Sequence, residues 1–196
     1  DIVKPRISKH MAKITDLGIL KQLINEIYNY NGNHNIKNAL KLVLHIPLRA
    51  ENLCNLKWNQ IDFEKKILTI PRENMKLSNI NLDDFVMPLT DEVIKILKEH
   101  KDMQLFSIKP KEYVFLGFNN RQAINKESPN RALFRLGFND EKKGTKIRLH
   151  GFRGTFRSLI DTLDTKNIFS FEVKERALDH HDKNLVARSY NHKANY

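Results

Sequence analysis

The feature that most constrains the fold of this chain is the spacing of its apolar residues, which recur every three or four positions over several stretches. Near the amino terminus these positions are Ile19, Leu20, Leu23, Ile24 and Ile27. Such spacing places the apolar side chains on one face of an α-helix. Thr15, which precedes the stretch, is a residue type that commonly caps a helix start. We therefore expect a helix that begins just after Thr15.

The same analysis predicts a largely helical chain with a small sheet. Further helices are predicted over 36–45, from Arg49 onward, from Thr90 to before Pro110, over 119–136 with a break at Pro129, over 149–163 and over 173–178. Residues 66–70 and 84–87 have the alternation of a β-hairpin, and 113–116 is a candidate for another strand. The expected fold class is mainly α with a small antiparallel β-sheet, that is α+β.

The charge of the chain points to a polyanionic partner. Its 196 residues carry a formal net charge of +11 at pH 7. Self-repulsion of this size is unfavourable unless a polyanion such as duplex DNA neutralises it, although a generally basic protein would have the same composition. No apolar run approaches the ~20 residues that span a membrane. We expect a cytoplasmic protein without a membrane partner.

One set of residues suggests phosphate chemistry. His150 and Arg153 are three residues apart, so a helix presents both side chains on one face. Arg49 and His180 are residue types that bind phosphate, and Tyr190 is a residue type that acts as a nucleophile beside such a site. Guanidinium and imidazole groups neutralise a phosphodiester, and a phenolic oxygen is able to attack phosphorus. The single cysteine, Cys54, has no partner for a disulfide or a Cys-x-x-Cys zinc site, so we expect a buried thiol.

These residues are embedded in segments that resemble one family. The segments are 45–62, 70–76, 149–156, 175–180 and 189–191. Their order and content resemble the tyrosine recombinases, or phage integrases, and above all the integrases of phages and genomic islands. The signature of that family falls on Arg49, Lys76, His150, Arg153, His180 and Tyr190. His181 and Tyr196 are rivals for the last two places, and the register of the motif favours His180 and Tyr190.

The resemblance implies a mechanism without metal or cofactor. The Tyr190 phenolate attacks a DNA phosphodiester to give a 3'-phosphotyrosyl link and a free 5'-hydroxyl, and reversal rejoins the strand. The implied roles are phosphate binding by Arg49 and Arg153, protonation of the leaving oxygen by Lys76, help with proton transfer by His150 and a hydrogen bond to phosphate from His180. The expected fold is that of the family's catalytic domain.

Two departures from the family pattern are visible. The family usually has an acidic residue three positions after the first arginine, and Asn52 stands there, next to Glu51. Either Glu51 takes that supporting role or the carboxylate is absent. The interval from Lys76 to the strand at 84–87 is also long for the family's hairpin.

The resemblance also predicts domains and partners. We expect residues 1–12 to be a linker or DNA-contacting arm and 13–196 to be the catalytic domain, with the upstream core-binding domain apparently absent. The expected partners are double-stranded DNA at attachment sites, three further protomers in a synaptic homotetramer, and DNA-bending accessory proteins.

Three other functions are compatible with parts of the pattern. A metal-dependent nuclease would use the ligands His150, Asp179, His180, His181 and Asp182, although nearby cations would weaken metal binding. A DNA-binding regulator would share the basic character without the chemistry. A type IB topoisomerase would relax DNA with a similar pocket, and the match around Trp58 and His150 favours an integrase.

Overall fold

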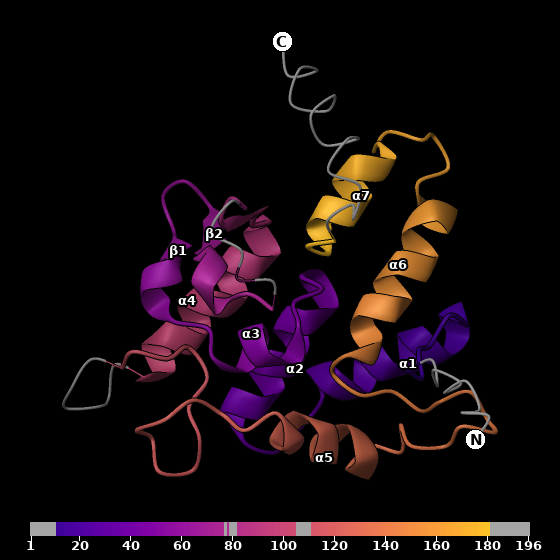
Figure 1. The fold of residues 1–196 in the computed structure, drawn as a ribbon. Helices are drawn as coiled ribbons and strands as arrows, with labels where there is room; N and C mark the ends of the chain where they lie inside the picture. Colours follow the sequence, from indigo (N-terminus) through magenta and orange to yellow (C-terminus); the bar gives the residue numbers. More distant parts are fainter. Residues whose placement is uncertain (1–10, 77, 79–81, 105–110, 181–196) are drawn as a thin grey trace, which may run out of the picture.

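The structure is a computed structural model, which describes residues 11–76, 78, 82–104 and 111–180 (Figure 1). In chain order its elements are α1 (Leu17–Tyr28), α2 (His34–His45), α3 (Ala50–Cys54), the 3-10 helix η1 (Trp58–Gln60), β1 (Ile61–Asp62), β2 (Ile67–Ile70), the 3-10 helix η2 (Arg72–Asn74), β3 (Phe85–Pro88), α4 (Asp91–Gln104), α5 (Glu127–Arg135), α6 (Gly151–Leu163) and α7 (Phe171–Ala177). The predicted class, mainly α with a small antiparallel sheet, is confirmed.

Helices α1 and α2 begin at residues whose side chains satisfy free backbone N–H groups. Asp16, rather than the predicted Thr15, caps α1 and accepts a hydrogen bond from the backbone of Ile19 at 2.9 Å. Asn33 caps α2, so this helix starts before the predicted position 36. An oxygen-bearing side chain at this position replaces a hydrogen bond that the first turn lacks.

The sheet has three antiparallel strands in the order β1-β2-β3. The hairpin of β2 and β3 was predicted, whereas the two-residue strand β1, which pairs Ile61 with Leu68, was not. Leu68 and Ile70 are each 1% exposed, so one face of β2 packs into the core. Lys66 has a φ of +53°, which ends the turn before the strand and excludes it from β2.

Helix α2 is the centre of the packed core. It contacts α1, α3, α4 and α5, which surround it in Figure 1. Fully buried core side chains include Leu23, Ile27, Leu40, Leu42, Leu97 and Phe115. Both hydrophobic flanks of α2 are covered, so the helix is held in one position. The segment that follows it, which contains Pro47 and Arg49, therefore starts from a fixed point at the edge of the core.

Two predictions in the middle of the chain were wrong. The helix predicted over 119–136 begins only at Glu127, and Pro129 lies in its first turn instead of breaking it. A first-turn residue does not need its N–H for a helical bond, so proline is accepted there. Residues 113–116 form isolated bridges, Tyr113 with Lys57 and Leu116 with Ala123, rather than a strand.

The segment before α1 packs along α6. A Cβ atom on Gly151 would lie 2.3 Å from the carbonyl oxygen of Ala12, so only glycine fits this position. The backbone N–H of Ile14 donates to the Thr155 hydroxyl at 3.1 Å. The glycine of the His-Gly-Phe-Arg sequence therefore serves packing, and it fixes the start of α6.

Helix α7 is tied to the end of α6 by a buried ammonium group. Lys174 is 5% exposed and lies 3.0 Å from a carboxylate oxygen of Asp161 and 3.0 Å from one of Asp164. Figure 1 shows that the carboxyl-terminal end of α7 is directed towards α3. This arrangement brings residues 178–180 to the start of α3. No helix in the described ranges is both long and apolar enough to cross a membrane.

Candidate active site

Five of the six predicted site residues lie in the described part of the chain. Arg49 is the N-cap residue of α3, Lys76 follows η2, His150 is the N-cap residue of α6, Arg153 lies in the first turn of α6 and His180 follows α7. Tyr190, like its rival Tyr196, lies outside the described residues. The elements that carry the five are distant in sequence and converge where α3, α6 and the end of α7 meet.

Arg153 is the most buried of these cations, at 7% exposed. Its Nη1 donates to the carbonyl of Pro47 at 2.8 Å, and its Nη2 donates to the carbonyl of Leu178 at 2.5 Å. The same Nη2 lies 3.2 Å from Nε2 of His180. The arginine thereby links the segment before α3 with the segment after α7.

Arg49 contacts a carboxylate that we had not assigned to it. Its Nη1 donates to Oδ2 of Asp179 at 2.5 Å, and its Nη2 to the Asp179 carbonyl at 3.3 Å. The other oxygen of Asp179 accepts from Nη1 of Arg72 at 2.8 Å. Sequence reasoning treated Asp179 only as a possible metal ligand and missed Arg72. No local pattern signals a contact between residues 107 positions apart.

His180 is oriented by a second carboxylate. Its Nδ1 lies 2.7 Å from Oε2 of Glu175, so this nitrogen carries the proton that Glu175 accepts. Its Nε2 faces Arg153, which only donates, so in the neutral ring this nitrogen is the acceptor. Glu175 also pairs with Nε of Arg157 at 2.6 Å, and Arg157 with Asp161 at 2.6 Å.

The cations are close enough to change one another's protonation. Burial and, after it, Arg49 lower the pKa of Arg153 to about 10, while Asp179 acts in the opposite direction. The pKa of His150 is lowered by burial and then by Arg153, Arg49 and Lys76. Positive charge therefore gathers around His150, and its imidazole is neutral at pH 7. An anion would be stabilised at this point.

The first departure seen in the sequence, at Glu51 and Asn52, has a structural counterpart. The side chain of Asn52 donates to the carbonyl of Asn74 at 2.9 Å and so holds the segment that leads to Lys76. Glu51 is exposed and pairs with Lys126 at 3.3 Å. The carboxylate that contacts Arg49 comes from Asp179 and not from Glu51 or position 52.

Among the described residues, no group of three or more His, Cys, Asp or Glu side chains is placed to hold a metal ion. His181 and Asp182, two of the ligands considered for a nuclease, lie outside those residues. The thiol of Cys54 is buried in α3, and burial, followed by the charge of Glu51, raises its pKa to about 12. This confirms the expectation of a buried thiol.

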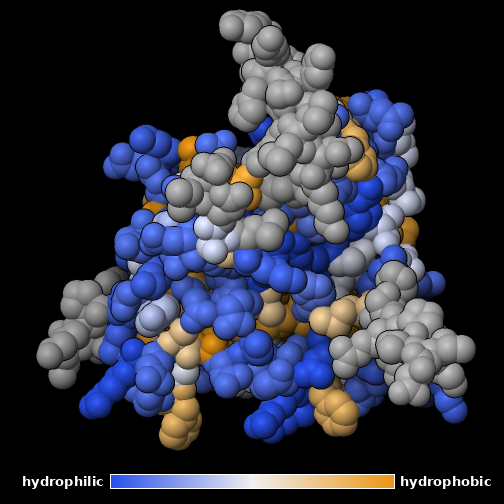
Figure 2. Space-filling view, viewed as in Figure 1, coloured by the Kyte–Doolittle hydropathy of each residue, from blue (hydrophilic) through white to orange (hydrophobic). Residues whose placement is uncertain are grey.

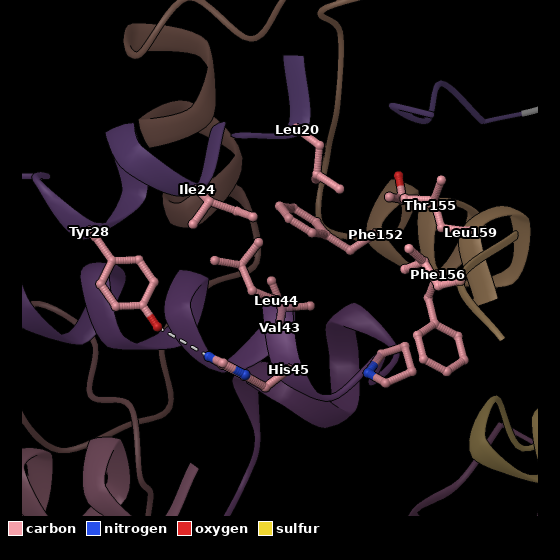
Figure 3. A pocket seen from close by; sticks show the side chains of 12 residues that line it. Leu20, Ile24, Tyr28, Val43, Leu44, His45, Phe152, Thr155, Phe156 and Leu159 are labelled. Carbon is pink, nitrogen blue, oxygen red and sulfur yellow. Dashed lines mark hydrogen bonds between the residues drawn. The ribbon is translucent and has the colours of Figure 1, made fainter. Parts of the chain in front are cut away.

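A separate pocket of about 240 Å³ lies between α1, α2 and α6 (Figure 3). Leu20, Leu44 and Phe156 are typical of its apolar lining, and Tyr28 and His45 form a hydrogen bond of 3.1 Å at one side. The lining includes no Lys, Arg, Asp or Glu from the described part of the chain. The face seen in Figure 2 is predominantly hydrophilic, with apolar side chains in small separate groups.

Comparison with known proteins agrees with this geometry. The phage integrase family matches residues 19–196, so the chain belongs to that family. It is similar to the putative protein IntB of Escherichia coli (strain K12), with 27% identity over 192 residues that cover 92% of this chain and 46% of that protein. It is also similar to the integrase of Enterobacteria phage P4, with 25% identity over 172 residues, 83% of this chain and 37% of that one.

Solved structures share the fold. XerH site-specific recombinase bound to difH substrate superposes with a TM-score of 0.66 at 13% identity, over 92% of this chain and 50% of that one. A lambda integrase tetramer bound to a Holliday junction gives 0.61 at 14% identity, over 95% and 50%. The chain spans less than half the length of the two relatives named above.

Proposed function

We propose that this chain is the catalytic domain of a site-specific DNA recombinase whose nucleophile is Tyr190. The observation that carries the proposal is the convergence of Arg49, His150 and Arg153, from distant parts of the sequence, on one place. There Arg49 lowers the pKa of Arg153, and both arginines lower the pKa of His150. Preorganised donors of this kind stabilise charge that develops in a transition state. Membership of the phage integrase family supports the same activity.

In the proposed reaction, the Tyr190 oxygen forms a bond to phosphorus while the bond to the 5'-oxygen breaks. Arg49 and Arg153 donate to the non-bridging oxygens, which carry extra charge in the pentacovalent transition state. Lys76 gives its proton to the leaving 5'-oxygen as general acid. The product is a 3'-phosphotyrosyl link, and attack by a 5'-hydroxyl of a partner strand reverses each step. Side chains supply all the positive charge in this scheme.

The two histidines take different parts. His150, whose pKa is lowered, is neutral at pH 7 and so is able to accept the phenolic proton of Tyr190. For His180 we propose a hydrogen bond to a phosphate oxygen, and its ring lies between Glu175, at Nδ1, and Arg153, at Nε2. The acid limb of the cleavage rate should therefore lie below pH 6.5, the ordinary pKa of histidine, and a His150→Gln variant should lose that limb in a pH–rate profile.

The partners follow by extension from the family. XerH recombinase is bound to its difH substrate in the solved structure, and lambda integrase is a tetramer bound to a Holliday junction. For this chain we propose double-stranded attachment sites, a synaptic homotetramer, DNA-bending accessory proteins and the integration or excision of a mobile element. We also propose that residues 1–12, of which 1–10 lie outside the described residues, are a linker or DNA-contacting arm. Residues 13–196 would be the catalytic domain, which acts with a core-binding domain.

The proposal is tested by covalent capture of DNA. The protein is incubated with duplexes randomised over the core, and complexes that survive denaturation are recovered and sequenced. The recovered site is then rebuilt with a nick near the scissile phosphate, so that the cleaved end diffuses away. An adduct that resists EDTA and maps to Tyr190, is absent from Tyr190→Phe and persists in Tyr196→Phe supports the proposal. Specific binding without an adduct would favour a binding module, and loss of cleavage with EDTA would favour a nuclease.

DNA binding should also depend strongly on salt. Arg49, Lys76 and Arg153 each meet phosphate oxygens in the proposed complex, and contacts of this kind release counterions from DNA. Affinity for the recovered duplex should fall steeply between about 50 and 200 mM salt in fluorescence anisotropy titrations. A flat response would contradict phosphate binding by this cluster.

A further inference from the structure

Asp179 lies at the centre of the candidate active site, although it belongs to none of the predicted signature positions. Its side chain is 2% exposed, and its two oxygens face two different arginines, Arg49 and Arg72. A buried carboxylate is costly unless it is paired, and two guanidinium partners satisfy it. From this geometry we infer that Asp179 is the positioning carboxylate of Arg49, supplied from the far end of the chain. The inference rests on the proposed function.

The contact with Arg49 fixes both the position and the plane of its guanidinium. Nη1 donates to Oδ2 of Asp179 and Nη2 donates to the carbonyl of the same residue. Two contacts from one residue restrict rotation about the last bonds of the arginine. A guanidinium has five N–H donors, so contact with Asp179 leaves donors that can serve a phosphate. An arginine held in this way already has the geometry that the charged transition state requires.

Arg72 holds the carboxylate in turn. It is 7% exposed, and its Nε donates to the carbonyl of Asp83 at 2.7 Å while its backbone N–H donates to Asp84 at 2.8 Å. These bonds tie Arg72, near the start of the connection between β2 and β3, to the end of that connection. The sheet region thereby sets the place of Asp179, and Asp179 sets the place of Arg49.

The backbone at Asp179 is consistent with a positioning role. Its φ is +50°, in the left-handed region that few residues other than glycine, asparagine and aspartate adopt. The neighbouring carbonyl of Leu178 accepts from Arg153, and the next residue is His180. The conformation at Asp179 therefore aligns three groups of the site at once: Arg49, Arg153 and His180.

The test compares two variants that each remove one carboxylate. Asparagine has the shape of aspartate and tolerates a positive φ, so Asp179→Asn keeps the shape while it removes the charge and replaces one acceptor oxygen with a donor. Glu51→Gln is the matched control, since Glu51 is exposed and pairs with Lys126. On the duplex recovered by covalent capture, Asp179→Asn should cleave about 10- to 100-fold more slowly in a single turnover, by analogy with lost outer-shell partners of metal ligands. Its Kd for that duplex should stay within about twofold of wild type, as should both values for Glu51→Gln.

Arg72 acts through Asp179, so the effects of the Arg72 and Asp179 substitutions on the cleavage rate should not be additive. Arg72→Gln should slow cleavage less than Asp179→Asn does, and the double variant should be no slower than Asp179→Asn alone. An additive loss would instead mean that Arg72 contacts the phosphate itself. Cleavage by Asp179→Asn that equals or exceeds the wild-type rate would overturn the inference, because the carboxylate would then be a bystander or a competitor of DNA.

A second measurement applies even where Asp179→Asn fails to fold. In ¹⁵N–¹H spectra of the wild-type protein, the Nη protons of Arg49, assigned by their loss in Arg49→Lys, should show slow rotation because Asp179 holds two of them. Averaged signals would overturn the inference. If the wild-type protein forms no adduct with DNA, the proposed function fails, while these spectra still decide whether Asp179 orients Arg49.

Discussion

Two regions of the molecule bury polar groups in opposite ways. In the core between α2 and α4, His100 is 0% exposed, its Nε2 donates to the carbonyl of Val114 at 2.7 Å and its Nδ1 accepts from Asn38 at 2.9 Å. Burial lowers its pKa to about 4, so the ring is neutral. In the candidate active site Arg153 is nearly as deep but stays charged, and it is held by the carbonyls of Pro47 and Leu178.

The difference distinguishes a polar group that is buried to stabilise the fold from a charged group that is buried to serve the proposed function. The His100 site is complete, because each ring nitrogen has a partner within the protein. Near Arg153 the cations Arg49 and Arg72 contact the carboxylate of Asp179, Lys76 acts on His150, and positive charge remains in excess. Folding alone does not favour such an excess, whereas a phosphate brought from outside would balance it. Each prediction below changes one region and asks whether the other responds.

The largest effect is expected in the core. Phe115 is 0% exposed and its ring centroid lies 5.2 Å from that of His100. Phe115→Ala should lower the free energy of unfolding by about 3–5 kcal/mol, because it removes buried apolar surface and leaves a cavity. Urea denaturation measures this loss. The folded fraction should bind DNA as wild type does, and a loss below ~1 kcal/mol would contradict the packing described.

His100 should make the stability depend on pH. Its pKa in the folded state, about 4, lies below the ordinary 6.5, so its contribution is present above pH 6.5 and is lost as the pH falls towards 4. The lowered pKa corresponds to about 3 kcal/mol. Urea titrations from pH 7 to 4 measure the free energy of unfolding. Over this range the wild type should lose about 3 kcal/mol more of it than a His100→Gln variant loses. Parallel curves would show that His100 is not the titrating group.

Arg49 tests the active-site region with little change in charge. Arg49→Lys keeps the cation and loses the two-donor geometry towards Asp179. Cleavage in a single turnover should slow by about 100-fold, comparable to one lost oxyanion donor, while the urea midpoint changes little. A lysine variant with the wild-type rate would mean that charge alone, and not the fixed geometry, is required.

The smallest effect is expected at the start of α1. The Asp16 side chain accepts the N–H of Ile19, and Asp16→Ala removes this cap. The expected loss is about 1 kcal/mol of unfolding free energy in urea denaturation, with DNA cleavage unchanged. A change in cleavage would show that α1 is coupled to the site through α6, and the separation of the two regions would then be wrong.

The sequence predicted those parts of the molecule that local patterns determine. The apolar period located α1, α2, α4 and α6, and alternation located β2 and β3. β1 has only two residues, which are too few to show a period. The polar stretch before α5 had the pattern of a helix, but in the structure its tertiary contacts hold it in a non-helical conformation. For the site, the family signature indicated Arg49, His150, Arg153 and His180. The links of Asp179 to Arg49 and Arg72 were not predictable, since they join segments that are far apart in the sequence and meet only in the folded chain. The contact of Glu175 with His180 spans only five residues and was not predicted either.

The most direct test of the central claim alters the DNA instead of the protein. If Arg49 stabilises negative charge on the scissile phosphate, then a methylphosphonate, which lacks that charge, should need it less. Single-turnover cleavage by Arg49→Ala is measured on both substrates and compared with wild type. On the phosphodiester, we predict that the variant is at least about 100-fold slower than wild type. On the neutral substrate, the ratio of the two rates should be smaller by at least about tenfold. Equal loss on both substrates would contradict an active site built to bind the charge of a DNA phosphate.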